Sequence, residues 1–456
     1  GGGTGGGSDG GIGGNGGGGS GTDHGNGRSP AMPFAHRNPT QGDRQVQVRH
    51  TMERTGGFSD PHSCVLRDAR DVMRHAQARK GRRPLLLRPP MLPGMPEAGA
   101  AAVAELLRTR RFLRWEFNVF ELETLSQGHS LWFAAMAVCY HYNFVGALRL
   151  DAERLSALFC TLERSYCFDP DHPNPYHTHV HAADVTLTVA HFLETPVITP
   201  AVRLQQALAL VLAAVMHDYR HPGVNNGYLV KRSHELAVMY NDESVLENFH
   251  AAQGFRLLLE PRHNALTGWK SEDVRSFRLT FVKCVLATDL AHSVAYASKF
   301  KQHCKERLPF DSPNAQIMLL QMLLKAADVA HPAKPWDVHC RWSQLITEEF
   351  FRQGDLERRE GLPISPLCDR AEVNLPKSQC NFIEFVVRPC LAPLAEYCGS
   401  GGVLWTDYLN TNFRAWKVMQ EQENPVLPWK LPPAPEDYDE TAGGGGGGGG
   451  RSAAVG

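Results

Sequence analysis

Segments with helical spacing follow one another along most of this chain, and alternating strand patterns are missing from its sequence. Residues 204–216 are apolar nearly all round, which predicts a buried central helix. Ranges 233–250, 277–291, 315–330 and 336–353 carry helical spacing as well. Proline and glycine mark the turns between them. We therefore predict an all-α fold: a compact, multi-helix domain.

Composition divides the chain into three parts. Residues 1–111 begin Gly-rich and become rich in Arg, Pro and Ala, so we predict that they are largely disordered, apart from a short helix over 67–79. The helical domain is predicted over 112–437. Residues 438–456 read as a disordered Gly-rich tail.

Charge and cysteine content narrow the class of protein. The net charge of −1 gives no whole-chain attraction to nucleic acid or to an anionic membrane. The 11 cysteines are scattered and form no CxxC pair, which favours a reduced, intracellular and cytoplasmic protein. No apolar run reaches the roughly 20 residues of a transmembrane helix, and no signal-peptide pattern opens the chain.

Histidine and aspartate stand at the ends of predicted helices, where side chains of separate helices can meet. His217 and Asp218 close the apolar central helix. Asp328 closes another apolar run, where a charge is costly unless it is paired or bound to a metal. His177 and His181 lie four residues apart, so they share one side if this piece is helical.

The ligand types indicate two kinds of metal ion. A mixed histidine and carboxylate set suits zinc or another transition ion, and Asp184, three residues beyond His181, would lie on the same side. A bridging carboxylate with water suits a neighbouring Mg²⁺ or Mn²⁺. Two such ions share a hydroxide and stabilise the attacking and leaving oxygens, so the pattern predicts a two-metal hydrolase of phosphate esters.

Several long motifs occur in a fixed order. They are Pro175-Tyr176-His177, 181–185, 217–226, 240–248, 286–289, 327–332, 348–355, 365–370, and Gln379 with Phe382. This series resembles the catalytic domain of class I 3′,5′-cyclic nucleotide phosphodiesterases, which has an HD-type fold with a binuclear metal site. The resemblance covers about residue 115 to about residue 432 and is closest to the calcium/calmodulin-dependent and cAMP-specific branches.

The resemblance implies a ligand set. His181, His217, Asp218 and Asp328 would hold the tighter ion, normally Zn²⁺, and Asp218 would also reach a second, normally Mg²⁺ or Mn²⁺. A hydroxide bridging the two ions would attack phosphorus. The implied substrate is cyclic AMP, cyclic GMP or both, and the product is the 5′-nucleoside monophosphate, so the enzyme would end cyclic nucleotide signalling.

The resemblance also assigns roles around the metals. His177 would be the general acid that protonates the leaving O3′, worth roughly 10²–10⁴-fold in rate. Glu247 would lie near His177 and keep it charged and oriented. His221 and His250 would lie near the waters of the second ion, and Asp289 would line the site.

A purine pocket follows from the same alignment of motifs. Gln379 would hydrogen-bond the purine edge, because an amide offers both a donor and an acceptor. Phe382 and Ile346 would clamp the ring, and Tyr176 and His331 would complete the pocket. Taken without the family, these side chains indicate ordinary helix packing. His331 replaces an Asn typical of cAMP-specific enzymes, which favours dual specificity.

Three positions depart from the family pattern. Arg220 stands where Asp or Glu is usual, Thr178 replaces Asn, and Phe249 replaces the first His of a pair. We expect the Arg220 side chain to face solvent rather than to weaken the second metal. Two other functions stay open: a metal phosphohydrolase acting on other nucleotides, and a catalytically dead protein that binds cyclic nucleotides.

A basic run, Arg79, Lys80, Arg82 and Arg83, borders the short helix predicted over 67–79, and a candidate calmodulin contact lies near 67–83. A solvated linker is favoured over a calmodulin or membrane-surface contact. The sequence does not specify an oligomeric state.

Overall fold

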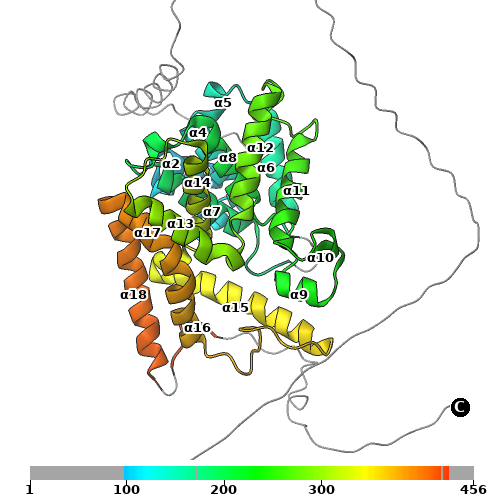
Figure 1. The fold of residues 1–456 in the computed structure, drawn as a ribbon, viewed down its shortest axis with the longest axis vertical. Helices are drawn as coiled ribbons and strands as arrows, with labels where there is room; N and C mark the ends of the chain where they lie inside the picture. The colour runs from blue at the N-terminus through cyan, green and yellow to red at the C-terminus, as the bar shows by residue number, and fades with distance from the viewer. Residues whose placement is uncertain (1–96, 168, 170–172, 423–424, 431–456) are drawn as a thin grey trace, which may run out of the picture. The chain divides into compact units, whose positions relative to one another are not determined.

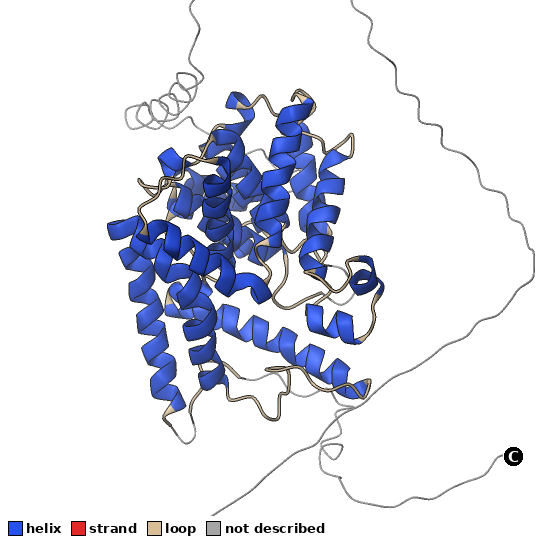
Figure 2. Ribbon diagram, viewed as in Figure 1, coloured by secondary structure: helices blue, strands red, loops and turns tan. Residues whose placement is uncertain are grey.

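A computed structural model describes residues 97–167, 169, 173–422 and 425–430, and this part of the chain is built from helices and loops (Figures 1 and 2). The α-helices are α2 (Glu97–Arg108), α3 (Val119–Leu125), α4 (Ser130–His141), α5 (Phe144–Ala147), α6 (Ala152–Arg164), α7 (His179–Leu193), α8 (Leu204–Met216), α9 (Asn226–Lys231), α10 (Glu235–Met239), α11 (Val245–Leu259), α12 (Ser271–Leu286), α13 (Ser293–Lys305), α14 (Pro313–Asp328), α15 (Trp336–Arg359), α16 (Leu375–Phe382), α17 (Arg388–Cys398) and α18 (Val403–Gln420). Short 3-10 helices are η1 (Arg111–Leu113), η2 (Thr199–Ala201), η3 (Leu290–His292), η4 (His331–Ala333) and η6 (Gly399–Gly402), and η5 (Ile383–Val387) is a π-helix. The all-α prediction is confirmed for these residues.

Helix α8 is the centre of the apolar core. It packs against α7 and α12, and α7 in turn packs against α4 and α14 (Figure 1). Every residue from Ala207 to Met216 is buried, and each buried Leu or Val contributes about 1.5–3 kcal/mol. The predicted central helix is confirmed. It ends at Met216, and His217 is its C-cap.

Backbone conformation divides one predicted helix in two. The range 233–250 was expected to be continuous, but α10 ends at Met239 and α11 begins at Val245. Asn241, Asp242 and Ser244 between them have φ values of 55°, 63° and 43°, in the left-handed region that interrupts an α-helix.

The N-terminal end of the described chain also differs from expectation. Little fixed structure was expected before residue 112, yet α2 covers Glu97–Arg108. Val103 and Leu106 of this helix are buried in the main core, because apolar residues three apart share one helix face. The predicted helix over 67–79 lies outside the described residues.

A second, smaller apolar cluster lies beside the main core. It joins α9, α10 and the start of α11, and Leu356 near the end of α15 and Leu362 just beyond it pack against it. Figure 1 shows α9 and α10 next to that end of α15. None of the described helices is both long enough and apolar enough to cross a membrane. The ten described cysteines are all free.

Candidate metal centre

Four side chains from three helices converge beneath the end of α8. His181 comes from the first turn of α7, His217 and Asp218 follow α8, and Asp328 is the last residue of α14. The two Nε2 atoms of His181 and His217 lie 3.2 Å apart. His217 Nε2 lies 3.0 Å from Asp218 Oδ2 and 3.3 Å from Asp328 Oδ1, and His181 Nε2 lies 3.1 Å from Asp328 Oδ1.

This arrangement fits a cation between the four groups. His217 Nδ1 donates to Ala214 O at 2.8 Å, so Nε2 is the ring nitrogen that faces the cluster and would bind an ion. Two imidazole nitrogens and two carboxylate oxygens then point at one another, and all four atoms lie within 4.8 Å. Histidine and carboxylate donors of this kind could hold a transition ion such as zinc.

An unpartnered histidine nitrogen of α11 lies beside Asp218. His250 Nδ1 donates to Tyr219 O at 2.8 Å, which leaves the buried Nε2 without a protein partner, 3.9 Å from Asp218 Oδ1. Burial lowers the pKa of His250 to about 4, so this nitrogen is an acceptor at neutral pH. A buried acceptor without a partner fits a hydrated ion, whose waters would donate to it.

His177 lies outside the helix that carries His181. Helix α7 begins at His179, and the Thr178 hydroxyl caps it by accepting from Val180 N at 3.3 Å. His177 Nδ1 donates to Glu349, and His177 Nε2 points toward Asp218 Oδ2 at 3.9 Å. Burial alone would lower the pKa of His177, but the Glu349 carboxylate raises it to about 9.

Glu349, rather than Glu247, is the partner of His177, so that part of the prediction is wrong. Glu349 Oε2 also accepts from the backbone N–H groups of Tyr176 (2.9 Å) and His177 (3.0 Å). Burial alone would raise the pKa of Glu349, but His177 lowers it to about 2. Glu247 lies instead against Asn226, whose Nδ2 donates to its Oε2 at 3.0 Å.

Two further carboxyl groups, those of Glu247 and Asp289, lie near the start of α11. Burial and the charge of Asp289 raise the pKa of Glu247 to about 7. Asp289 Oδ2 accepts from Ser244 Oγ at 2.6 Å. His221 stacks on His177 with ring centroids 3.8 Å apart, and burial, together with the charge of His177, holds the pKa of His221 well below its usual range.

Helix α15 supports the centre with a row of buried polar side chains four residues apart. Glu349 binds the 176–177 backbone, as described above. Gln353 Oε1 accepts from Asn225 N at 2.9 Å, in the loop that leads from His221 to α9. Glu357 Oε2 accepts from Ser365 N at 2.6 Å. One helix face therefore fixes three separate segments around the site.

A chain of hydrogen bonds runs behind the predicted purine pocket. Trp416 Nε1 donates to His339 Nε2 at 2.7 Å. His339 Nδ1 lies 3.3 Å from Ser343 Oγ and 3.1 Å from His331 Nδ1. Ser343 Oγ donates to Gln379 Oε1 at 3.2 Å. Neither His339 nor Ser343 is among the site residues predicted from the sequence.

The other predicted pocket residues lie around this chain. His331 and Phe382 stack with ring centroids 5.7 Å apart, and the Tyr176 ring lies 4.6 Å from that of His181. Ile346 is half-buried on α15, one turn beyond Ser343. Ring contacts therefore join Phe382, His331 and Tyr176 to His181 of the metal centre, and contact of the predicted pocket residues with a base stays a prediction.

The three unusual positions have local structural explanations. Thr178 acts as the α7 cap. Phe249 is buried in the smaller apolar cluster, and its neighbour His250 faces the metal centre. Arg220 is partly exposed, has a φ of 63°, and donates its backbone N–H to Tyr166 O at 2.7 Å. Asp184 lies near Lys334 (3.9 Å) and is not among the four converging groups.

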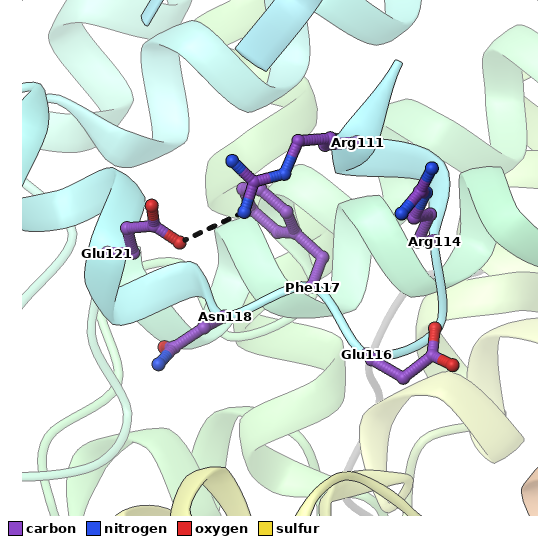
Figure 3. Close-up of a pocket in the computed structure, with 6 residues that line it drawn as sticks. All are labelled: Arg111, Arg114, Glu116, Phe117, Asn118 and Glu121. Carbon is purple, nitrogen blue, oxygen red and sulfur yellow. Dashed lines mark ion pairs between the residues drawn. The ribbon is translucent and has the colours of Figure 1, made fainter. Parts of the chain in front are cut away.

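A surface hollow of about 520 Å³ lies near the start of α3 (Figure 3). Arg111 and Glu121 form an ion pair at 3.8 Å across part of it. The lining residues are Arg111, Arg114, Glu116, Phe117, Asn118 and Glu121. None of them belongs to the metal centre.

Comparison with known proteins identifies the family of this chain. Residues 176–404 match the family model for 3′5′-cyclic nucleotide phosphodiesterase. The chain belongs to the 3′5′-cyclic nucleotide phosphodiesterase family.

Similar proteins come from several animals. A Caenorhabditis elegans protein named as a probable 3′,5′-cyclic phosphodiesterase is 36% identical over 64% of this chain and 43% of its own length. Dual specificity calcium/calmodulin-dependent 3′,5′-cyclic nucleotide phosphodiesterase 1C of Mus musculus is 36% identical over 62% of this chain and 39% of its own length. The 1B protein of Homo sapiens is 36% identical over 62% of this chain and 51% of its own length. The chain therefore matches about half or less of each relative.

Proposed function

We propose that this chain hydrolyses 3′,5′-cyclic AMP and cyclic GMP to the 5′-nucleoside monophosphates. The observation that carries the proposal is the convergence of His181, His217, Asp218 and Asp328 beside a histidine that is held protonated. Cyclic nucleotides contain a strained phosphodiester whose O3′ is a poor leaving group, so the reaction needs a nucleophile on one side of phosphorus and a proton donor on the other.

The four converging side chains would hold one ion, and Asp218 with the waters near His250 would hold a second. Bound there, two divalent ions supply an activated water and stabilise negative charge on the phosphate oxygens. We infer Zn²⁺ for the site with two histidines and Mg²⁺ or Mn²⁺ for the carboxylate site, from the preferences of these ions for their ligands.

His177 would supply the proton. Its Nδ1–H donates to Glu349, which fixes the ring, and its Nε2 faces the centre. A pKa near 9 keeps Nε2 protonated at neutral pH. When the P–O3′ bond breaks, the Nε2 proton passes to O3′, and the oxygen of the attacking water becomes part of the 5′-phosphate.

The Gln379 amide would form hydrogen bonds with either purine base. Burial lowers the pKa of His339 to about 3, and Trp416 donates to its Nε2, so the proton of this neutral ring lies on Nδ1. The Ser343 hydroxyl beyond it can both donate and accept, so it satisfies Gln379 in either amide orientation. Adenine and guanine present opposite donor and acceptor patterns at the 1 and 6 positions, and a reversible amide matches both. The mouse and human relatives are named dual specificity enzymes.

Two further predictions accompany this function. The names of the mammalian relatives include dependence on calcium and calmodulin, and a calmodulin contact near 67–83 stays a prediction, because that segment lies outside the described residues. A cytoplasmic, intracellular location also stays a prediction.

The test is hydrolysis of cyclic AMP and cyclic GMP by the purified full chain, before and after metal chelation. We expect release of 5′-AMP and 5′-GMP that is lost on chelation and restored by divalent metal. His177→Ala should retain its tightly bound metal, measured by elemental analysis, and lose turnover. Full activity in that variant would refute the assignment of the acid. Binding without turnover by the wild-type chain would favour a protein that only binds cyclic nucleotides.

A further inference from the structure

Lys325 is a buried cation directly behind the metal centre. It lies on α14, one turn before Asp328, and its side chain is fully buried. Its ammonium group donates to Ala287 O and Asp289 O, both at 2.8 Å, and to Thr288 O at 3.4 Å. Burying a lysine costs several kcal/mol unless its charge is compensated, and here three carbonyls match its three donors.

The carbonyls that Lys325 binds follow the C-terminal end of α12. The last carbonyls of a helix lack partners within the helix and carry the negative end of its dipole, so a cation is favoured there. Gln321, one turn earlier on α14, donates its Nε2 to Lys283 O at 3.0 Å. Two side chains of α14 therefore hold the end of α12 and the turn 287–289 in place.

That turn carries Asp289 toward α11. The Asp289 carboxylate accepts from Ser244 Oγ at 2.6 Å and from Ala291 N at 2.8 Å. Ser244 directly precedes α11, and Glu247 lies in its first turn, where the charge of Asp289 acts on it. The same helix carries His250, whose unpartnered Nε2 faces Asp218. Asp289 thus joins the turn 287–289 to the start of α11, the helix that carries His250.

We propose that Lys325 is a positioning residue for the second ion, acting through the turn 287–289 and Asp289. The proposal rests on the proposed function, because it takes the centre to hold two ions. The C-terminal end of α14 then positions the ligand Asp328 directly and Asp289 through Lys325, so Asp328 and Asp289 move together. If Lys325 acted through its charge alone, replacing it would strengthen binding of the second ion, because removing a positive charge near a cation site favours the cation. Positioning through the turn predicts weaker binding instead.

The test measures Mn²⁺ binding to the full chain by electron paramagnetic resonance of the free ion, in wild type and Lys325→Met. Methionine keeps the length of the apolar stem and removes the donors. Because supporting side chains around metal sites contribute at least about 10-fold in affinity, we expect Mn²⁺ to bind at least about 10-fold more weakly. The tightly bound metal, measured by elemental analysis, and the KM for cyclic AMP should stay unchanged.

Lys334→Met is the matched control. Lys334 is also buried. Its ammonium donates to Trp115 O at 3.2 Å and lies near Asp184, and neither of these residues belongs to the turn 287–289. We expect this variant to lower the melting temperature and to leave Mn²⁺ affinity unchanged.

Other outcomes would refute either the positioning role of Lys325 or the proposed function. Tighter Mn²⁺ binding in Lys325→Met would mean that the lysine acts by its charge, and unchanged binding with a lower melting temperature would mean a purely structural role. If Lys325→Met does not fold, Lys325→Leu also replaces the donors with an apolar side chain, and unchanged Mn²⁺ affinity in it again overturns the proposal. A wild-type chain that binds Mn²⁺ without hydrolysing cyclic nucleotides would refute the function alone, and one that binds no Mn²⁺ would refute both.

Discussion

Glu349→Gln isolates the charge that holds His177 protonated. The carboxamide keeps the shape of Glu349 and an oxygen that can still accept from the Tyr176 and His177 backbone N–H groups. In the wild-type structure the pKa of His177 is about 9, against an ordinary value of 6.5. That difference corresponds to about 3 kcal/mol of preference for the protonated ring.

Without the carboxylate we expect the pKa of His177 to fall toward its ordinary value of 6.5, because burial lowers it while the charges of Asp218 and Asp328 still raise it. A general acid works in its protonated form, so activity is present below its pKa and is lost as pH rises through it. At about pH 7.5 nearly all wild-type His177 carries the proton, but only about one tenth would do so at a pKa of about 6.5. We therefore expect kcat to fall by up to about 10-fold at that pH, and the alkaline limb of kcat/KM to move from about 9 toward about 6.5.

The assay is the pH profile of kcat/KM for cyclic AMP in both proteins, with metal content checked by elemental analysis. Bis(4-nitrophenyl) phosphate serves as a second substrate. Its leaving group departs without a proton, so the variant should lose less activity toward it than toward cyclic AMP. An alkaline limb that stays in place, or an equal loss with both substrates, would refute the role given to Glu349.

Two further substitutions test the pocket and the packing. Ser343→Ala removes the 3.2 Å bond to Gln379, and because such a bond contributes about 0.5–1.5 kcal/mol, we expect KM for both cyclic nucleotides to rise about 2–10-fold at similar kcat in steady-state assays; unchanged KM would count against the orienting role. Gly354→Ala would place a Cβ atom 1.9 Å from Cys368 O, so urea unfolding should show a loss of at least about 1–3 kcal/mol. Gly268→Ala, with nothing within 4 Å, should have wild-type stability, and equal stability of the two variants would contradict the close approach at Gly354.

The ligand-bearing helix ends could be predicted from the sequence because each follows an apolar run. Burial of 204–216 fixes where His217 and Asp218 emerge, and the apolar run before Asp328 does the same for α14. Side chains at the ends of packed helices can meet only in a few ways, so local pattern and helix packing together define the cluster. The same pattern gave no warning of the break between α10 and α11, which depends on left-handed residues such as Asn241.

The partner of His177 could not be predicted in this way. Glu247 and Glu349 both lie on predicted helices within long motifs, and Glu349 is 172 residues from His177 in the chain. Helical spacing says which residues share a face, but it does not say which segment that face meets. The repeat of polar residues at 349, 353 and 357 was the available indication, because a buried polar face needs partners from elsewhere in the fold.

The row of polar side chains on α15 makes this helix sensitive to its length. Glu349, Gln353 and Glu357 reach three separate segments only because they are four residues apart on a helix with 3.6 residues per turn. One inserted or deleted residue between 349 and 353 would rotate the remainder by about 100° and withdraw two attachments at once. A substitution removes only one. Across the family, this stretch should therefore accept exchanges of side chains more readily than insertions or deletions.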